Sequence, residues 1–483
     1  MHVLSLEVST SSAKCILYSR EEGVVLARSR QYPKEASDGL TQDPGGILVS
    51  AYEVLGQVAR ESSARGINPA AVGLCGTWHS MLLLDRDLLP IGRIRTWADL
   101  TGAKAAAAAR AGGEAADYYS RTGCVLHGMY PCWKLAGMTA EDKGLSGASY
   151  IITQLEWLYL SLAGERAVST CLASGSGLLN VHTLDWDEKA LAAAGAGRNM
   201  LSPLRDLMYH GRLTRKASAL TGLPEGLPVF IGGADGAMNQ LAVGGTDPGV
   251  MSMSVGTSGA MRRITKVPKV AAKPSTWCYN VSEDAWIAGA ATNNATNCVD
   301  WFIANVGMTP GDPGAYDELG KAAFGKDRSK APVFLPFIFG ERCPGWQEER
   351  AGGFFGIGPK HDRGSLYYSV LEGILFNMYQ CYGILEGLTG PPSRIVVSGG
   401  ITRSAEWMQL AADIFGLKLE TTGSANDSTV GAALVAISGL EGESAVELPE
   451  EEPSAVYEPV AKNREALMER YGKYLGMYAS TAP

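Results

Sequence analysis

The chain has 483 residues with a formal net charge of −8, and 46% of its residues are hydrophobic while 19% are charged. This length exceeds what one hydrophobic core supports, so we expect two domains in a folded, globular protein. Because the charge balance is acidic and Lys and Arg form no dense cluster, the sequence argues against nucleic acid or an anionic membrane as a partner.

The nine cysteines are scattered and form no Cys-x-x-Cys pair. This pattern is typical of reduced thiols rather than of disulfides or zinc ligands. No apolar run reaches the length of a membrane span. The segment from Met1 to Ser9 has no basic start and carries Glu7 inside its apolar stretch, unlike a secretory signal. We therefore expect a cytoplasmic protein that does not enter membranes.

Short apolar strands alternate with helical patterns along the chain, which is typical of an α/β architecture. In chain order, the expected strands are residues 2–8, 14–18, 23–28, 71–74, 81–85, 229–232 and 394–398. The clearest expected helices are residues 101–111 and 366–387. The second helix gathers its apolar side chains on one face, which indicates packing into a core.

The opening of the chain recurs near its middle. VMSMSVGTSGA at 250–260 matches VLSLEVSTSSA at 3–13 with an offset of 247 residues, so that Thr10 falls on Thr257. Self-similarity at this distance predicts a duplicated domain, although two unrelated hairpins with small-residue turns are the alternative. We expect the boundary at a cluster of turn residues, giving an N-terminal domain of residues 1–243 and a C-terminal domain of residues 244–483.

Three turns rich in Gly, Ser and Thr follow expected strands. Small residues there let backbone N–H groups approach an anion closely, so each turn is a candidate phosphate or nucleotide loop, with an ordinary tight turn as the alternative. The turns are Ser9, Thr10, Ser11 and Ser12 with Lys14 close behind, then Gly256, Thr257, Ser258 and Gly259, then Ser398, Gly399 and Gly400. Neither a Walker-type loop nor a dinucleotide fingerprint occurs, so another kind of nucleotide fold is expected.

The segment GGADGAMNQ at 232–240 places Asp235 after a strand and two glycines. Transfer of a phosphoryl group to an alcohol needs a carboxylate that accepts the proton of the attacking hydroxyl. We interpret Asp235 as that base, while an aspartate in a surface turn is the alternative.

These motifs, in this order and spacing, resemble the FGGY carbohydrate kinases over nearly the whole chain. LEVSTSSAK is similar to the family's first phosphate loop, GGADG to its catalytic segment, SVGTSGAM to its second phosphate loop and VVSGGITRS to its adenosine-binding turn. Further stretches resemble its gluconate-kinase side: GTWHSMLLLD, RTWAD, SGLLNVHTLDWDEKAL, WCYNVSEDAWIAGAATNN, LPFIFGERCPGW and NDSTVGAALVA. The resemblance implies two RNase-H-like domains of the actin-like ATPase superfamily with a cleft between them, and ATP and Mg²⁺ as cofactors.

The resemblance also implies a role for each motif residue. The sugar would lie against Trp78, His79, Trp97, Asp99 and Asp235. The ATP phosphates would lie against Thr10, Ser11, Lys14, Gly256, Thr257 and Ser258, and the adenosine against Gly399, Gly400 and Ser404. Glu7 and Asp235 would hold Mg²⁺ mostly through water.

The chain departs from the family pattern at three positions. Glu7 and Ser9 stand where the family usually has Asp and Gly, and Thr101 stands where many members have Arg. The extra methylene of Glu7 displaces its carboxylate by about an angstrom, enough to alter rate. A serine at position 9 can still form the turn if its φ is not positive.

The function we expect is phosphoryl transfer from MgATP to a hydroxyl of a sugar acid, sugar or polyol. Gluconate is the first choice, and xylulose or another ketose comes next. The alternatives are an actin-like or chaperone-like ATPase that uses no sugar, and a sugar-binding regulator whose kinase activity has decayed. A substrate carboxylate would need a cationic partner, for which the chain offers Lys14, Lys134 and Arg342. The sequence leaves the oligomeric state open, and a homodimer is the commonest closed assembly.

Overall fold

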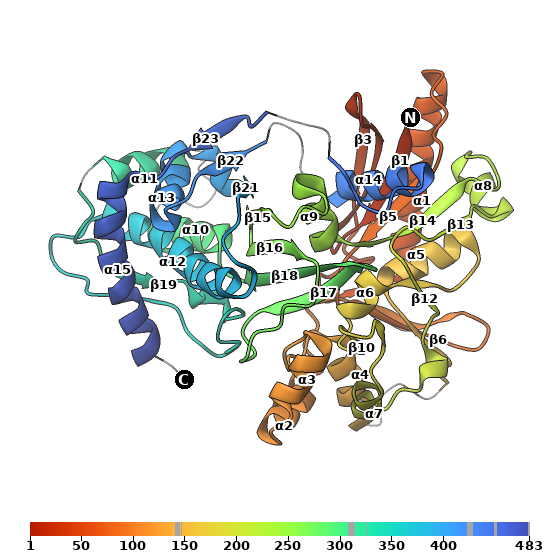
Figure 1. The fold of residues 1–483 in the computed structure, drawn as a ribbon, viewed down its shortest axis with the longest axis horizontal. Coiled ribbons are helices and arrows are strands. Elements are labelled where there is room, and N and C mark those ends of the chain that lie inside the picture. Colours follow the sequence, from red (N-terminus) through yellow and green to blue (C-terminus); the bar gives the residue numbers. More distant parts are fainter. Residues whose placement is uncertain are drawn as a thin grey trace. The chain divides into compact units, whose positions relative to one another are not determined.

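The computed structural model describes residues 1–140, 145, 147–307, 314–325, 327–422, 428–448 and 452–481 (Figure 1). The chain forms two compact units. Unit 1 contains Met1–Asp247, Ile264–Ala288 and Ser424–Glu450, which includes the helix α14 (Ser428–Glu441); unit 2 contains Pro248–Arg263, Gly289–Gly423 and Glu451–Pro483. Among the described residues, no helix is long and apolar enough to cross a membrane.

Unit 1 is built on a six-stranded sheet. Its strands, in spatial order, are β13 (His210–Arg212), β14 (Pro228–Ala234), β5 (Val72–Gly76), β1 (Val3–Val8), β2 (Ser12–Ser19) and β3 (Gly23–Gln31). The three central strands β14, β5 and β1 run parallel, and the flanking strands are antiparallel. A smaller sheet has the order β4 (Thr41–Gln42), β7 (Pro90–Arg95), β6 (Met81–Leu84) and β8 (Tyr150–Ile152).

Helices cover both faces of the six-stranded sheet. The helices of unit 1 are α1 (Pro44–Ala64), α2 (Ala103–Ala111), α3 (Ala115–Thr122), α4 (Pro131–Ala140), α5 (Gln154–Ala163), α6 (Thr170–Ser174), α7 (Glu188–Ala194), α8 (Arg215–Thr221), α9 (Asp235–Gly244) and α14. On β5, Gly73 approaches the backbone of α14 while Gly76 approaches Leu155 of α5. Because these glycines are three residues apart, they face opposite sides of the sheet, so α5 and α14 lie on opposite faces. Strand β1 is accordingly buried along nearly its whole length.

Unit 2 repeats this arrangement. Five neighbouring strands of a seven-stranded sheet are, in spatial order, β16 (Gly259–Thr265), β15 (Val250–Val255), β21 (Arg394–Ser398), β22 (Leu419–Thr421) and β23 (Ala455–Tyr457). The order and directions of these strands match β2, β1, β5, β14 and β13 of unit 1. The helices of unit 2 are α10 (Thr296–Phe302), α11 (Ala315–Phe324), α12 (Arg363–Thr389), α13 (Ala405–Phe415) and α15 (Ala461–Ser480). The predicted duplication is therefore a duplication of fold.

The two copies differ in their first turn. Val8 of β1 lies opposite Ala13, whereas Val255 of β15 lies opposite Gly259. Four residues therefore lie between the last paired residues of β1 and β2 and three between those of β15 and β16, although the sequence match runs through both turns without a gap. The strand register shifts by one residue as a result.

Candidate active site

The predicted site segments of unit 1 leave one edge of its sheet. In the paired register, Glu7 of β1 lies opposite Cys75 of β5, which in turn lies opposite Gly233 of β14. The strands run parallel, so the turn after β1, the turn after β5 and Asp235 after β14 all begin at the carboxyl ends of neighbouring strands. Adjacent strands lie about 4.8 Å apart, which places the three segments within about 10 Å of one another. Open α/β sheets bind their ligands at this edge.

The first turn is held by the side chain of Ser9. Its hydroxyl accepts hydrogen bonds from the backbone N–H groups of Ser11 (3.3 Å) and Ser12 (3.1 Å). Among the described residues other than glycine, those with positive φ are His79, Leu88, Leu184 and Trp346. Ser9 thus adopts a negative φ, and the turn forms without the glycine that the family usually has there.

Trp97 contacts this turn from the segment that follows β7. Its indole N–H donates a hydrogen bond of 3.0 Å to the hydroxyl of Thr10, and 40% of its surface is exposed. A hydroxyl that accepts from Trp97 still has its own hydrogen to donate. The structure therefore brings a predicted sugar residue and a predicted phosphate residue into direct contact.

Asp235 is the first residue of α9, so its carboxylate lies at the positive end of the helix dipole. The preceding strand bulges between Phe230 and Gly233, where the pairing of β14 with β5 shifts register. Gly232 makes this bulge with φ 62°, and a Cβ there would lie 1.7 Å from the carbonyl oxygen of Leu74. Bulges of this kind re-aim a side chain beside an active site, and here the aimed side chain is Asp235.

Trp78 and Asp235 both lie near Cys171 of the short helix α6. Its indole N–H donates to the carbonyl of Cys171 at 2.9 Å. Burial, with the nearby carboxylates of Asp235 and Asp206, raises the pKa of the Cys171 thiol to about 12. Gly175 follows α6, and a Cβ there would lie 2.3 Å from the Trp78 ring, so only glycine fits against the indole.

His79 has a positive φ of 65°, a strained conformation for a residue other than glycine. Its Nδ1 lies 2.6 Å from the carbonyl of Gly175, which can only accept. Nδ1 therefore carries a hydrogen and donates it to this carbonyl. The imidazole packs edge-on against Tyr130 and Tyr279, with ring centroids 4.9 and 5.8 Å away. The hydroxyls of these tyrosines lie 2.8 Å apart. Tyr279 belongs to the quoted stretch WCYNVSEDAWIAGAATNN, whereas Tyr130 belongs to no stretch singled out from the sequence.

Lys134 of α4 contacts the backbone of the segments that carry His79 and Trp97. It is fully buried, and its ammonium donates to the carbonyls of His79 (2.8 Å) and Thr96 (2.5 Å). Burial lowers its pKa to about 7. Because its hydrogens are directed at these carbonyls, Lys134 fits a structural role better than that of a partner for a substrate carboxylate.

Asp99 lies on the same segment as Trp97, after β7, and is buried. Burial opposes its ionisation, but hydrogen bonds from the Thr101 backbone and from Arg95 hold the pKa of Asp99 below its usual value. The Arg95 guanidinium donates to Asp99 at 2.7 Å. Thr101, which replaces the arginine of many family members, thus helps to fix Asp99 through its own backbone N–H, at 2.8 Å.

Glu7 and Lys14 lie directly opposite each other on β1 and β2. The Glu7 carboxylate accepts a hydrogen bond of 2.6 Å from the hydroxyl of Ser428, at the start of α14. In the part of the chain that the structure describes, no group of three or more His, Cys, Asp and Glu could form a metal cage. The two predicted carboxylates, Glu7 and Asp235, fit Mg²⁺, which takes one or two carboxylates together with phosphate oxygens and water. Asn426 and Asp427 of the stretch NDSTVGAALVA lie outside the described residues.

In unit 2, the structure brings the two predicted nucleotide turns together. Ser254 of β15 lies opposite Ser398 of β21, so the turns that follow them are neighbours. Gly399 has φ 95°, and a Cβ there would lie 2.5 Å from the carbonyl oxygen of Val255. The side chains of Thr257 and Ser258 are exposed. Gly400 follows this contact, while Gly256 donates its backbone N–H to the carbonyl of Ser258.

Ser404 lies at the start of α13, where its hydroxyl accepts from the backbone N–H of Trp407 at 3.2 Å. This is the bond of a helix N-cap, and it stabilises the first turn of α13. The binding roles of all these residues stay predictions, but each unit gathers its own predicted residues at one sheet edge.

Known proteins resemble this chain in sequence and in fold. The N-terminal and C-terminal domain models of the FGGY family of carbohydrate kinases match residues 2–242 and 251–440. Gluconokinase of Bacillus subtilis (strain 168) is 29% identical over 455 residues, which cover 90% of this chain and 87% of that protein.

Two crystal structures extend the likeness. Gluconate kinase from Lactobacillus acidophilus superposes with a TM-score of 0.92 at 25% identity, over 99% of this chain and 98% of that chain. Ligand-bound xylulose kinase from the same organism gives 0.91 at 25% identity, with the same coverage. The chain therefore belongs to the FGGY family of carbohydrate kinases, ATP-dependent enzymes built from two RNase-H-like domains of the actin-like ATPase type.

Proposed function

We propose that this kinase phosphorylates a hydroxyl of gluconate, with Asp235 as the general base. The observation that carries the catalytic assignment is the position of Asp235 at the N-terminus of α9, after a bulge that only glycine permits and near Cys171, whose carbonyl accepts from Trp78. The choice of gluconate rests on the similarity to the Bacillus subtilis gluconokinase. Xylulose or another ketose is the competing substrate.

In this proposal, the acceptor hydroxyl lies against Asp235, which takes its proton as the phosphoryl group arrives. His79 binds a second hydroxyl of the substrate, and the exposed face of Trp97 covers the apolar side of the carbon chain. Asp99 orders the segment that carries Trp97. A carboxylate that is positioned as the base contributes roughly 10²- to 10⁴-fold in rate.

The small side chains of the turns would bind the phosphates of ATP. Thr10, Ser11 and Thr257 are proposed to donate their hydroxyl hydrogens to phosphate oxygens, and Ser258 to offer its backbone N–H, while Gly256 closes the turn through its own N–H. Lys14 adds a positive charge close to the first turn. Gly399, Gly400 and Ser404 would form the edge against which the adenosine lies, where the positive φ of Gly399 brings the two backbones together.

Magnesium would be held mainly by phosphate oxygens and water, with Glu7 and Asp235 nearby. The ion would neutralise charge on the phosphoryl group that is transferred. Glu7 is oriented by the hydroxyl of Ser428, so its longer side chain has a fixed direction. This contact supports an active enzyme over a decayed sugar-binding regulator.

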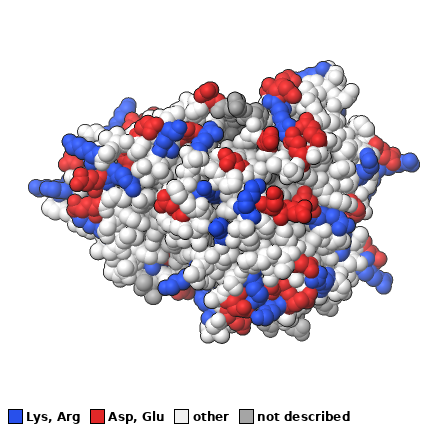
Figure 2. All heavy atoms as spheres, in the orientation of Figure 1, with Lys and Arg blue, Asp and Glu red and all other residues white. Residues whose placement is uncertain are grey.

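We further propose a cytoplasmic homodimer that uses no nucleic acid or membrane. All nine cysteines are buried thiols, which supports a reducing compartment. On the face shown in Figure 2, Lys and Arg alternate with Asp and Glu, so positive charge does not gather there as it does on nucleic-acid binding surfaces.

A substrate panel tests the proposed function. Purified protein is mixed with ATP and Mg²⁺, and ADP release is measured with gluconate, xylulose, other ketoses and glycerol. The proposal predicts that kcat/KM for gluconate exceeds that for each neutral sugar by at least about tenfold, the range that a few pocket contacts supply. A higher value with xylulose would reject gluconate, and equal ADP release without any sugar would favour an ATPase.

A further inference from the structure

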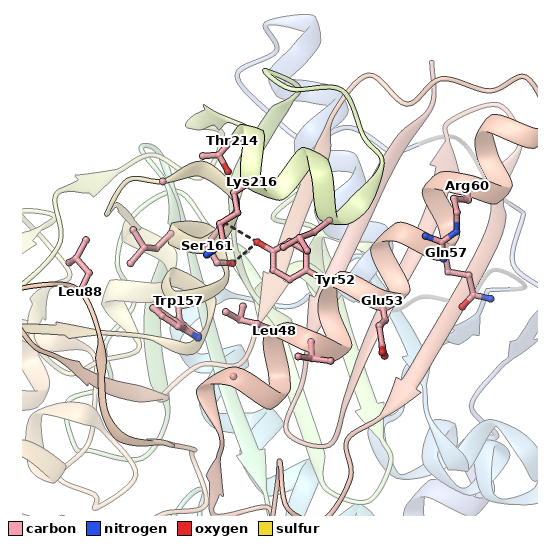
Figure 3. A pocket seen from close by; sticks show the side chains of 15 residues that line it. Leu48, Tyr52, Glu53, Gln57, Arg60, Leu88, Trp157, Ser161, Thr214 and Lys216 are labelled. Carbon is pink, nitrogen blue, oxygen red and sulfur yellow. Dashed lines mark hydrogen bonds between the residues drawn. The ribbon is translucent and has the colours of Figure 1, made fainter.

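Helices α1 and α5 lie side by side on unit 1 and are tied to each other by side-chain hydrogen bonds. The indole of Trp157 donates to the carbonyl of Pro44 at 2.9 Å, and the hydroxyl of Tyr52 donates to the carbonyl of Ser161 at 2.9 Å. The bonds between Tyr52 and Ser161 are drawn in Figure 3, at a surface groove of about 920 Å³ that both helices line. The N-termini of the two helices are thereby held in a fixed relation.

Each of these N-termini carries a fully buried glutamine. Gln42 ends β4, two residues before α1, and Gln154 is the first residue of α5. The Gln42 amide nitrogen donates to the carbonyls of Ser9 and Thr10, both at 2.9 Å. The Gln154 amide nitrogen donates to the side-chain oxygen of Gln42 at 2.6 Å and to the carbonyl of Ser9 at 3.1 Å. Both amides are therefore hydrogen-bonded to the backbone of the first phosphate turn.

The other end of Gln154 contacts the sugar-side segment. Its amide oxygen accepts from the backbone N–H of Thr77 at 3.3 Å and from the Thr77 hydroxyl at 3.1 Å. Thr77 is followed directly by Trp78 and His79. A chain of hydrogen bonds thus runs from the sugar-side segment through two buried amides to the turn of Thr10.

The chemistry of the partners fixes the direction of this chain. The carbonyls of Ser9 and Thr10 can only accept, so the nitrogen of Gln42 must face them and its oxygen must face Gln154. The nitrogen of Gln154 must then face Gln42, which turns its oxygen towards Thr77. Only a side chain that donates at one end and accepts at the other fits either position, and a carboxylate of the same size does not.

We infer that Gln42 and Gln154 form a positioning bridge, which sets the first phosphate turn relative to the sugar-binding segment so that the γ-phosphate meets the acceptor hydroxyl. The inference rests on the proposed roles of Thr10, Trp78 and His79. Neither glutamine touches a reacting atom. A misplacement of about 1 Å between reacting groups lowers rate by about 10²-fold, which is the size of effect that the bridge prevents.

The test replaces each glutamine with methionine, which has a similar length and no hydrogen-bonding amide. For Gln154→Met we expect kcat to fall by about 10²-fold, while the Kd of the sugar and the Kd of ATP, each measured alone by calorimetry, change less than threefold. Because the two residues act as one unit, the double variant Gln42→Met/Gln154→Met should be no slower than the worse single variant. Effects that multiply in the double variant would overturn the bridge.

A charge variant gives a second readout, the pH dependence of kcat, which would not change if the glutamine had a purely structural role. In Gln154→Glu, the introduced carboxylate would face the oxygens of Gln42 and Ser9 without a hydrogen to donate. Protonation restores one donor, so kcat relative to the natural protein should rise as the pH is lowered. A ratio that stays flat with pH would contradict the inference.

Hydrogen exchange separates the bridge from the proposed function, since it needs no substrate. Gln154→Met should speed amide exchange in residues 8–13, although the substitution lies on another element. Two controls are matched: Gln57→Met changes an exposed amide on α1, and Ser62→Ala removes a buried hydroxyl that donates to Ile67 at the far end of the same helix. Both should leave kcat and exchange in residues 8–13 unchanged. Unaltered exchange in Gln154→Met would reject the bridge whatever the substrate, whereas failure of the natural protein on gluconate alone rejects only that substrate.

Discussion

Lys134 shows how a single buried group ties the site to pH. Its ammonium is removed from water and bonded to two carbonyls, and burial lowers its pKa to about 7. Asp99 acts in the opposite direction and Arg95 in the same direction as burial. The folded protein therefore releases this proton at a lower pH than the unfolded chain, whose lysines titrate near 10.4.

The sign of the resulting pH dependence follows from proton counting. Between about pH 7 and pH 10, the unfolded chain holds the proton and the folded chain does not, so the unfolding free energy rises with pH. Relative to Lys134→Met, the natural protein should gain stability over this window by an amount on the order of 4 kcal/mol, and lose it again as pH falls to 7. Urea unfolding at several pH values measures the difference. Lys104→Met, an exposed lysine on α2, should show no such slope.

Gly232 gives a second prediction at the residue scale. Its φ is 62°, and an added Cβ would lie 1.7 Å from the carbonyl oxygen of Leu74. Gly232→Ala should therefore destabilise unit 1 by more than 3 kcal/mol, roughly the combined size of a left-handed residue and an overpacked contact. Gly226→Ala has a similar φ of 82° with nothing within 4 Å, and should lose only about 1 kcal/mol. Equal melting temperatures for the two variants would contradict the bulge as the reason for this glycine.

The sequence identifies the motif residues but not the contacts that support them. Thr10, Asp235 and Gly399 stand in turns whose small residues announce a close approach of backbone. Lys134, Gln42 and the tyrosines at 130 and 279 come from elements far apart in the chain, and only the packing of those elements brings them to the site. A lysine inside a helical pattern gives no sign that it is buried, because most lysines are exposed.

At the scale of elements, the apolar patterns predicted which helices and strands are present better than they predicted the residues at which these elements begin and end. The strand predicted at 394–398 has those bounds in β21, and the helix predicted at 366–387 lies inside α12. The helix predicted at 101–111 begins at Ala103, because the preceding residues form the turn that fixes Asp99. The one-residue shift between the two first turns could not be predicted, since it depends on pairing across strands rather than on the sequence of either one.

The packing of α15 on α12 rests on a buried ion pair. Arg470 donates to Glu372 at 2.6 and 2.5 Å and also to the carbonyl of Ala331 at 2.8 Å, and both charged side chains are buried. Arg470→Met leaves the carboxylate buried without its cation, so it should destabilise unit 2 by about 3 to 5 kcal/mol.

The matched variants separate the charge from the packing. Arg470→Met/Glu372→Met removes both charges and should recover most of the lost stability. Lys473→Met breaks the exposed pair with Glu469 on the same helix and should change stability by less than about 0.5 kcal/mol. If the double variant melts below the single variant in a calorimeter, the ion pair itself stabilises the helix contact.

At the scale of the whole molecule, the chain returns to unit 1 after it has built most of unit 2. Helix α14 packs on α9, β1 and β5, and the close approach of Gly431 to the backbone of Met238 shows how tightly the helices meet. The predicted boundary at residue 244 lies just before the duplicated sequence, which restarts at Val250. Completion of the first sheet's core, by contrast, needs residues from the far end of the chain.

A fragment of residues 1–243 should therefore fail to fold by itself. Without α14, one face of β1 and β5 loses its covering helix, and exposed apolar surface of that size favours aggregation. We expect no cooperative thermal transition for the fragment in circular dichroism. A fragment joined through a flexible linker to residues 424–450 should recover one. A sharp transition for residues 1–243 alone would show that α14 is dispensable.

The central claim is that Asp235 removes the proton of the acceptor alcohol, and the most direct test is the steady-state rate of ADP release by Asp235→Asn. The substitution keeps the size of the side chain and removes its basicity. We predict that kcat with the preferred sugar falls by roughly 10²- to 10⁴-fold while calorimetry still detects sugar binding. Turnover close to that of the natural protein would contradict the account.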